Sequence, residues 1–132
     1  MTKSKVKIYY RDTDCGGVVY YGRYLEYFEI GRTRYMEERG VDIAAEAAGG
    51  TLFAVRSASV KYISPALYGD TLTIDTVLES VRGARINFTY RVTREDGGEI
   101  AEGETLLACI DPDMRPRRVP ERIIERLSAG RD

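Results

Sequence analysis

One long stretch of the chain has helical periodicity. From Arg23 to Arg39, apolar side chains recur every three or four positions, which predicts an amphipathic helix that ends at Gly40. Gly31 lies within the apolar stripe of this helix. A glycine in a helix interior costs about 1 kcal/mol relative to alanine, so we expect Gly31 to permit close packing against a sheet.

Alternation of apolar and polar residues predicts one strand before this helix and four strands after it. The five segments are Lys5–Arg11, Leu52–Ile63, Thr71–Val81, Arg85–Arg94 and Glu99–Asp111. Asp96-Gly97-Gly98 is a typical hairpin turn. Two short helices are also predicted, one over Asp42–Ala48 and one that begins at Pro120.

This order of elements predicts a single α+β domain over residues 1–132, with one long helix against an antiparallel sheet of about five strands. The exposed edges of such a sheet favour self-association. The second face of the sheet carries Thr, Asn, Asp and Arg side chains, which suit either solvent or a polar contact with another subunit.

The composition excludes several kinds of site. Lys and Arg number 20 against 21 Asp and Glu, so the net charge of −1 gives no reason to expect nucleic acid or an anionic membrane. The absence of histidine excludes Ser-His-Asp and Cys-His sites within the chain. Cys15 and Cys109 are too few for a zinc ribbon, and Cys109 suits a core position. Without a signal-peptide or membrane-spanning pattern, we expect a soluble cytoplasmic protein.

The candidate chemistry lies between the first strand and the long helix. Two carboxylates, Asp12 and Asp14, are followed closely by Gly16 and Gly17. Aspartate binds its own backbone in turns, and glycine permits positive φ and close backbone approach. The residues therefore fit a tight turn with capping aspartates, which is the simpler interpretation, and they also fit a site that carries chemistry.

The run from Tyr10 to Leu25 resembles the active-site signature of hotdog-fold acyl-CoA thioesterases. The most similar type is the 4-hydroxybenzoyl-CoA thioesterase family, with its broad-range acyl-CoA thioesterase branch. Residues 27–29, 31–33, 65–70 and 115–120 continue the resemblance. It implies a hotdog fold, hydrolysis of an acyl-CoA to a free acid and coenzyme A, and no metal or redox cofactor. It also implies a homodimer or homotetramer with active sites at protomer interfaces.

The resemblance assigns roles within this run. Asp14 is the catalytic carboxylate, acting either as nucleophile or as general base for water. The backbone N–H of Tyr21 holds the thioester oxygen, at a helix start that offers unpaired N–H groups and partial positive charge. Many broad-range members carry histidine at this position, but a backbone donor survives the change to tyrosine. Asp12 then keeps a structural role, and Gly16 and Gly17 let the thioester approach the backbone.

The remaining predicted contacts are with coenzyme A and the acyl group. Two arginine clusters suit the phosphate groups of coenzyme A. One is Arg82 with Arg85, and the other is Arg115 with Arg117 and Arg118. Solvated surface charge explains each cluster equally well. The strand before Pro65-Ala66, which carries Val60 and Lys61, resembles the strand along which the pantetheine arm runs in the family. Tyr20, near the turn, suits the wall of an acyl pocket. The predicted substrate-binding residues are Gly16, Gly17, Tyr20, Val60, Lys61, Arg82, Arg85, Arg117 and Arg118.

Two other functions stay open. One is a non-catalytic acyl-CoA binder or regulator on the same fold, and the presence of Asp14 argues against it. The other is a hotdog hydratase or dehydratase. Those enzymes pair a histidine with a carboxylate, and this chain has no histidine.

Overall fold

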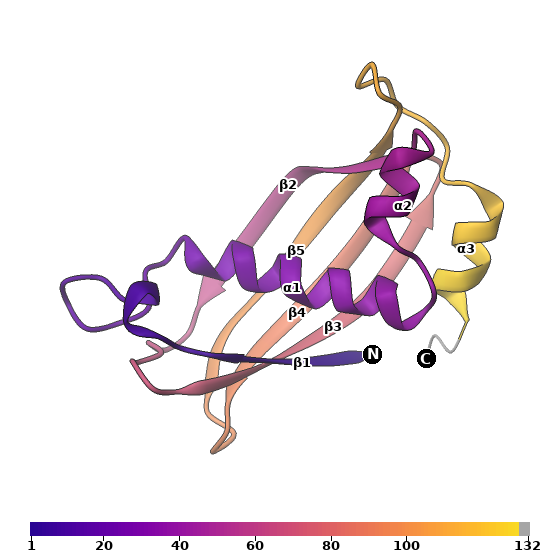
Figure 1. Ribbon diagram of the computed structural model, residues 1–132. Coiled ribbons are helices and arrows are strands. Elements are labelled where there is room, and N and C mark those ends of the chain that lie inside the picture. The colour runs from indigo at the N-terminus through magenta and orange to yellow at the C-terminus, as the bar shows by residue number, and fades with distance from the viewer. Residues whose placement is uncertain (130–132) are drawn as a thin grey trace.

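Five strands form one antiparallel sheet, and a long helix lies across it (Figure 1). The computed structural model describes residues 1–129. The sheet order is β1-β3-β4-β5-β2, and the predicted α+β class is confirmed. The elements are β1 (Thr2–Lys7), the 3₁₀ turn η1 (Tyr10–Asp12), α1 (Arg23–Glu38), α2 (Ile43–Ala48), β2 (Leu52–Tyr62), β3 (Thr71–Arg82), β4 (Arg85–Arg94), β5 (Glu99–Ile110) and α3 (Glu121–Ser128).

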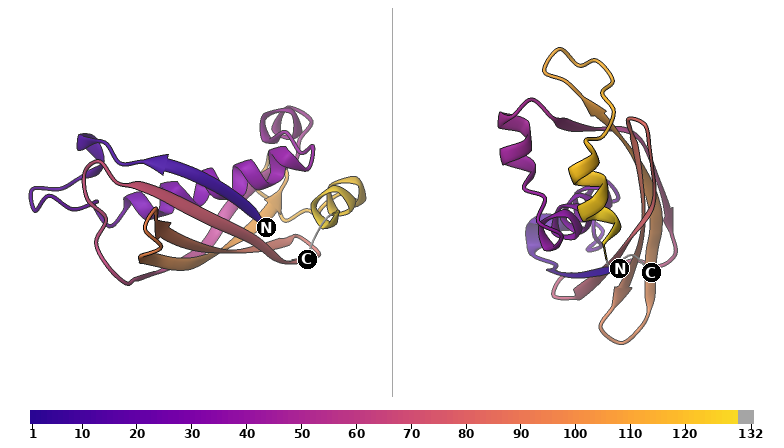
Figure 2. Two further views of the ribbon diagram at one scale, coloured as in Figure 1. Left: turned by 90° about the horizontal axis from the view of Figure 1, so that it is seen from below. Right: turned by 90° about the vertical axis from the view of Figure 1, so that its right-hand side faces the viewer.

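Helices α1, α2 and α3 all lie on the same side of the sheet (Figure 2). The core forms between α1 and the inner sheet face, where alternate residues of β3 and β4 are buried. Aromatic stacking joins the two layers, because the ring of Phe28 on α1 lies parallel to the ring of Tyr90 on β4, with centroids 4.3 Å apart. The buried residues of α1 are Tyr24, Tyr27, Phe28, Gly31, Tyr35 and Met36.

Two glycines set how closely α1 approaches the sheet. A Cβ atom at Gly31 would collide with the Thr76 hydroxyl and lie 3.0 Å from Ile74. On β5, a Cβ atom at Gly103 would lie 2.6 Å from the ring of Phe28. The prediction that Gly31 permits close packing is confirmed, and Gly103 makes room in the same way on the sheet side.

The first strand begins and ends earlier than the predicted Lys5–Arg11. After Lys7, the chain leaves the ladder and the N–H of Ile8 donates to the Asp70 carbonyl at 2.8 Å. The N–H of Tyr9 donates to the Asp12 carboxylate, also at 2.8 Å, and so begins a 3₁₀ turn instead of continuing the strand. Tyr10 therefore does not share the buried face of Ile8 and is 80% exposed.

The outer face of the sheet carries a row of alternating charges that crosses all five strands. In register, Lys3 faces Asp75, Asp75 faces Arg91, Arg91 faces Glu102, and Glu102 faces Lys61. The row ends in ion pairs of 2.9 Å between Lys3 and Asp75 and 3.9 Å between Lys61 and Glu102. Because each charge has opposite charges as neighbours, this face favours solvent over a charged partner.

The two edge strands of the sheet differ in their side chains. The exposed residues of β1 are lysines, which oppose pairing with another strand. The exposed middle of β2 is largely small and uncharged. The side chains concerned are Lys3, Lys5 and Lys7 on β1, and Ser57, Ala58 and Ser59 on β2. The β2 edge is therefore the one that is more open to a partner strand.

Helices α2 and α3 close the far end of the sheet from the start of α1 (Figure 1). Asp42 caps α2 as predicted, because its carboxylate accepts the N–H groups of Ala44 and Ala45. Glu46 on α2 forms two parallel contacts of 2.5 and 2.6 Å with the guanidinium of Arg122 on α3. The hydrogen bonds from Arg122 lower the pKa of the Glu46 carboxyl.

Substitution of Gly31 tests the close contact between α1 and the sheet. We expect Gly31→Ala to reduce the free energy of unfolding by about 1–3 kcal/mol, because the added methyl group overpacks a filled interface. Urea unfolding measures this loss. Gly49→Ala is the matched control, because the nearest atom to its Cβ is at an ordinary 3.5 Å. Adding Thr76→Ala should restore part of the loss, and no recovery would contradict a clash at Thr76.

Candidate active site

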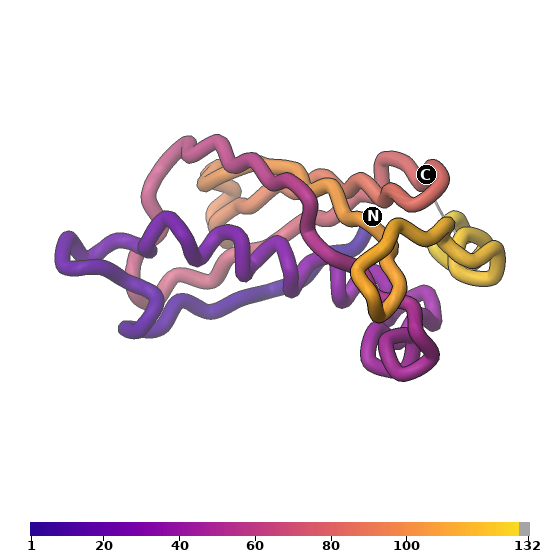
Figure 3. The backbone as a smooth tube through the Cα atoms, turned by 90° about the horizontal axis from the view of Figure 1, so that it is seen from above, coloured from indigo at the N-terminus to yellow at the C-terminus, as the bar shows by residue number. Residues whose placement is uncertain are grey.

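The run that resembles a catalytic signature forms a loop at one end of the sheet, beside the start of α1 (Figures 1 and 3). The N–H of Asp14 donates to the Val18 carbonyl at 2.9 Å, and the N–H of Gly17 donates to the Asp14 carbonyl at 3.1 Å. Gly17 has a φ of 80°, which favours glycine at this position. The N–H of Val19 then donates to the Ala66 carbonyl at 2.9 Å. The loop thus has a fixed path between η1 and α1.

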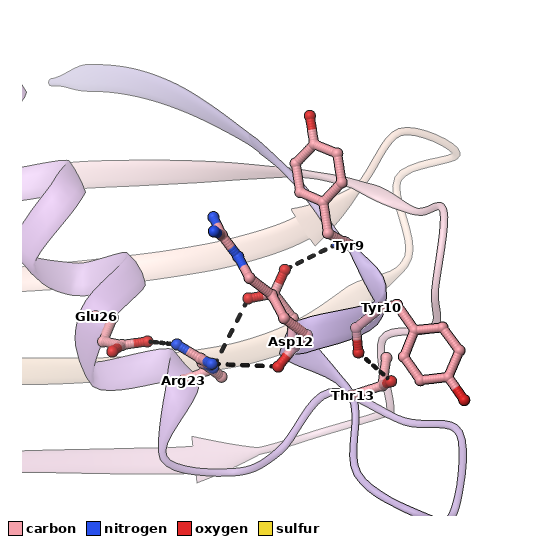
Figure 4. Close-up of polar contacts among 7 residues, drawn as sticks. Tyr9, Tyr10, Asp12, Thr13, Arg23 and Glu26 are labelled. Atoms are coloured by element: carbon pink, nitrogen blue, oxygen red, sulfur yellow. Dashed lines mark hydrogen bonds and ion pairs between the residues drawn. The ribbon is translucent and has the colours of Figure 1, made fainter.

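Asp12 joins the segments on either side of this loop (Figure 4). Its carboxylate accepts the N–H of Tyr9 at 2.8 Å and lies 3.7 Å from Nε of Arg23, and its carbonyl accepts the N–H of Tyr20 at 2.9 Å. The side chain is buried, at 6% exposure. Burial raises the pKa of the adjacent Tyr27 phenol, and the Asp12 charge raises it further. The predicted structural role of Asp12 is confirmed.

Asp14 differs from Asp12 because its side chain is exposed to solvent. One carboxylate oxygen, Oδ1, accepts the N–H of Gly16 at 2.8 Å. Within residues 1–129, the other oxygen has no hydrogen bond or ion pair. A Cβ atom at Gly16 would lie only 3.2 Å from Oδ1, so glycine keeps this contact open. The carboxylate is therefore oriented through one oxygen and available through the other.

Two adjacent N–H groups at the start of α1, those of Tyr21 and Gly22, have no acceptor among the described residues. Their neighbours are satisfied, because Tyr20 donates to Asp12 and Arg23 donates to the Tyr20 carbonyl at 2.9 Å. The first turn of a helix combines free N–H groups with partial positive charge. This end of α1 can therefore hold an oxygen that carries negative charge.

A pocket of about 250 Å³ lies against the start of α1. Its wall includes Tyr62, whose hydroxyl donates to the Tyr21 carbonyl at 3.1 Å and whose ring meets that of Tyr24 edge-on. The lining residues are Val19, Tyr21, Tyr24, Tyr62, Ile63, Ser64 and Pro65. The sequence did not single out Tyr62 or Ile63 as site residues, and only their position just before the Pro65-Ala66 motif pointed to them.

Tyr20 occupies a different place from the pocket wall predicted for it. Its ring is not among the pocket-lining residues and packs against the ring of Tyr21, with centroids 4.5 Å apart. It also covers Gly22, where a Cβ atom would lie 2.9 Å from the Tyr20 ring. Tyr20 therefore shapes the backbone at the start of α1.

The two predicted arginine clusters come together at one place. Arg82 and Arg85 face each other across the β3–β4 hairpin. The N–H of Val119 donates to the Gly83 carbonyl of this hairpin at 2.9 Å, which brings Arg118 beside it. Like charges at facing strand positions repel, so this end of the sheet suits an anion.

The other predicted substrate-binding residues have contacts of their own. Arg117 donates from Nη1 to the Gly50 carbonyl at 3.1 Å. Lys61 lies on β2 within the charged row of the outer face, 3.9 Å from Glu102. Val60 precedes it and is partly buried against the core. These contacts leave Arg82, Arg85 and Arg118 as the better candidates for phosphate groups.

The arginine end and the Asp14 end lie far apart within one chain. Thr71 at the start of β3 pairs with Lys7, close to the loop that carries Asp14, while Arg82 ends the same strand. A strand of 12 residues is roughly 36–40 Å long. The structure thus brings the arginines together and places them at the opposite end of the sheet from Asp14.

Among residues 1–129, no three His, Cys, Asp or Glu side chains are grouped so that they could hold a metal ion. In the same part of the chain, no helix combines the length and apolar character needed to cross a membrane. Cys15 is exposed, and Cys109 is buried in the core as predicted.

Known proteins match the chain over nearly its whole length. The acyl-CoA thioester hydrolase YbgC of Escherichia coli is 38% identical over 120 residues, which cover 90% of each chain. The acyl-CoA thioesterase YbgC of Haemophilus influenzae is 33% identical over 89% of this chain and 88% of its own. Residues 9–127 match the thioesterase-like superfamily.

Solved structures share the same fold. The hypothetical protein TT1821 of Thermus thermophilus superposes with a TM-score of 0.91 at 32% identity, over 97% of this chain and 98% of its own. The DHNA-CoA thioesterase of Staphylococcus aureus gives a TM-score of 0.86 at 28% identity, over 89% of this chain and 79% of its own. The predicted hotdog fold is confirmed, and the chain belongs to the thioesterase-like superfamily.

Proposed function

We propose that this protein hydrolyses an acyl-CoA thioester to a free acid and coenzyme A. The observation that carries the proposal is the pairing of a carboxylate that has one free oxygen with unpaired N–H groups at a helix start, beside a small aromatic pocket. The YbgC proteins of Escherichia coli and Haemophilus influenzae, which are named as acyl-CoA thioester hydrolase and thioesterase, support the substrate class.

In this proposal, the free oxygen of Asp14 supplies the chemistry. As a nucleophile, it attacks the thioester carbon, forms a mixed anhydride and releases the coenzyme A thiolate, and water then hydrolyses the anhydride. As a general base, it takes a proton from water while the water oxygen attacks the same carbon, and the tetrahedral intermediate then breaks its C–S bond and releases the coenzyme A thiolate. The hydrogen bond from Gly16 orients the carboxylate in both routes.

The start of α1 stabilises the charge that develops on the thioester oxygen. The Tyr21 N–H is the donor, and removal of one such donor typically costs about 10²–10³ in rate. The tyrosine ring is not needed for this role, because any residue except proline supplies an N–H. The acyl group lies in the pocket beside Tyr24 and Tyr62.

We further propose that two copies share each active site. The arginines that suit coenzyme A phosphates lie at the wrong end of the sheet to serve Asp14 of their own chain. Antiparallel pairing of two β2 edges about a twofold axis reverses the second copy. That reversal carries Arg82, Arg85 and Arg118 of one copy toward the Asp14 loop of the other. The small uncharged residues Ser57, Ala58 and Ser59 in the exposed part of β2 support this choice of edge, next to the exposed Arg56.

Replacement of Asp14 tests the catalytic assignment. We expect Asp14→Asn to lower kcat by about 10²–10⁴, because the amide is neither a base nor a nucleophile of comparable strength. Thiol release from acetyl-, hexanoyl-, palmitoyl- and benzoyl-CoA measures turnover. Asp96→Asn is the matched control, because Asp96 Oδ1 accepts the Gly98 N–H at the same 2.8 Å in the β4–β5 hairpin. Full turnover by Asp14→Asn would refute the assignment, and an inactive wild type would favour the acyl-CoA binder.

Substitutions of Asp12 and Asp14 should differ in their effect on stability as well as in their effect on activity. We expect Asp12→Ala to reduce the free energy of unfolding by about 1–3 kcal/mol, because the N–H of Tyr9 loses its acceptor in a partly buried hydrogen bond. Asp14→Ala should change it by less than about 0.5 kcal/mol, because Asp14 is exposed. Urea unfolding of both variants provides the comparison. Equal losses would contradict the division of roles.

Mixed dimers test the shared site. One parent carries Asp14→Asn, and the other carries Arg82→Glu with Arg118→Glu, which should raise KM strongly. After subunit exchange at equal amounts, half of the dimers are mixed and each holds one intact site, so about a quarter of wild-type activity should return. A chain that carries all three substitutions, mixed with Asp14→Asn, is the control and should stay inactive. Unrestored activity in confirmed mixed dimers would place the site within one chain.

A further inference from the structure

A single hydrogen bond joins the end of β2 to the first turn of α1. Tyr62 is the last residue of β2, and its hydroxyl donates to the Tyr21 carbonyl at 3.1 Å. Its ring meets the buried Tyr24 ring at a centroid distance of 5.4 Å and an angle of 74°. The ring and the hydroxyl of Tyr62 thus have different partners. Phenylalanine at position 62 would keep the first contact and remove the second.

The carbonyl that Tyr62 binds belongs to the same peptide group as the N–H of Gly22. This peptide is planar and trans, so its C=O and N–H point in opposite directions. A bond that fixes the direction of the carbonyl therefore also fixes the direction of the N–H. The Gly22 N–H has no acceptor within residues 1–129 and lies next to the free N–H of Tyr21.

The preceding peptide group is held in a similar way. The carbonyl of Tyr20 accepts the N–H of Arg23 at 2.9 Å, while the N–H of Tyr21 in the same peptide stays open. Two consecutive peptides thus have their carbonyl oxygens bonded and their N–H groups available. A hydrogen bond to a carbonyl also polarises its peptide and strengthens the next bond by about 10–30%.

We propose that the Gly22 N–H is a second donor to the thioester oxygen and that Tyr62 is the positioning residue that aims and polarises it. The inference rests on the proposed thioester hydrolysis and adds a residue to that site. Tyr62 does not touch the reacting atoms and acts through the Tyr21–Gly22 peptide. Tyr21 and Tyr62, which this hydrogen bond joins, both line the aromatic pocket.

The first test is Tyr62→Phe, assayed with the best substrate among acetyl-, hexanoyl-, palmitoyl- and benzoyl-CoA. We expect kcat to fall about tenfold with KM nearly unchanged, less than for loss of a whole donor, because the N–H remains and the Tyr21 carbonyl keeps its longer 3.4 Å bond from the Tyr24 N–H. Incorporation of 3-fluorotyrosine at position 62 keeps the hydroxyl and should restore kcat. Tyr68→Phe is the control, an exposed tyrosine at the same end of the molecule that packs against Tyr10. Equal kcat for wild type and Tyr62→Phe would overturn the proposal.

The second test does not depend on turnover. Two coenzyme A analogues are compared, a ketone in which methylene replaces the thioester sulfur and a thioether that lacks the carbonyl. Tyr62→Phe should weaken binding of the ketone and move its bound C=O stretch toward the free value, with thioether binding unchanged. Equal weakening of both analogues, or an unmoved C=O stretch, would overturn the role of Tyr62. A wild type that binds both analogues but hydrolyses no acyl-CoA would refute the proposed function instead.

Discussion

The close contact between α1 and the sheet determines where the rest of the candidate site lies. Gly31 and Gly103 leave no methyl group between the two layers, so Phe28 stacks directly on the sheet. The start of α1 is thereby held close to the end of β2, so that the Tyr62 hydroxyl at the end of β2 reaches the Tyr21 carbonyl. A helix raised by one side-chain layer would break that bond, because hydrogen bonds weaken steeply beyond ordinary distances.

The two aspartates show how neighbouring residues with the same side chain take opposite roles. Asp12 is buried, and its carboxylate binds the Tyr9 N–H at the start of η1 and lies beside Arg23 of α1, so both of its oxygens have structural contacts. Asp14 stands beyond the turn, where only the Gly16 N–H reaches it and one oxygen stays open. Asp12 anchors the backbone on both sides of the loop, through Tyr9 and Tyr20, while the Gly16 N–H orients the Asp14 carboxylate.

Local patterns predicted the helix and the hairpins, because periodicity and turn residues act over a few positions, whereas the family followed from the resemblance of the run from Tyr10 to Leu25. The predicted end of the first strand was wrong, since the Tyr9 N–H donates to the Asp12 carboxylate and not to a neighbouring strand. Tyr62 was missed because its partner lies 41 residues away, and contacts of that range depend on packing. The separation of Asp14 from Arg82 follows only from strand order and register, which alternation alone does not specify.

Strand β2 links the two proposals physically. Its outer edge is the one that suits a second copy, and its last residue is Tyr62, which holds the peptide at the start of α1. A single chain leaves Asp14 open to water, whereas a partner on β2 would cover the loop and strengthen every charge interaction there. Pairing would also restrict the strand that carries Tyr62. Association through β2 would therefore supply the distant arginines and stiffen the oxyanion donor in one step, so a loss of pairing should lower kcat as well as raise KM.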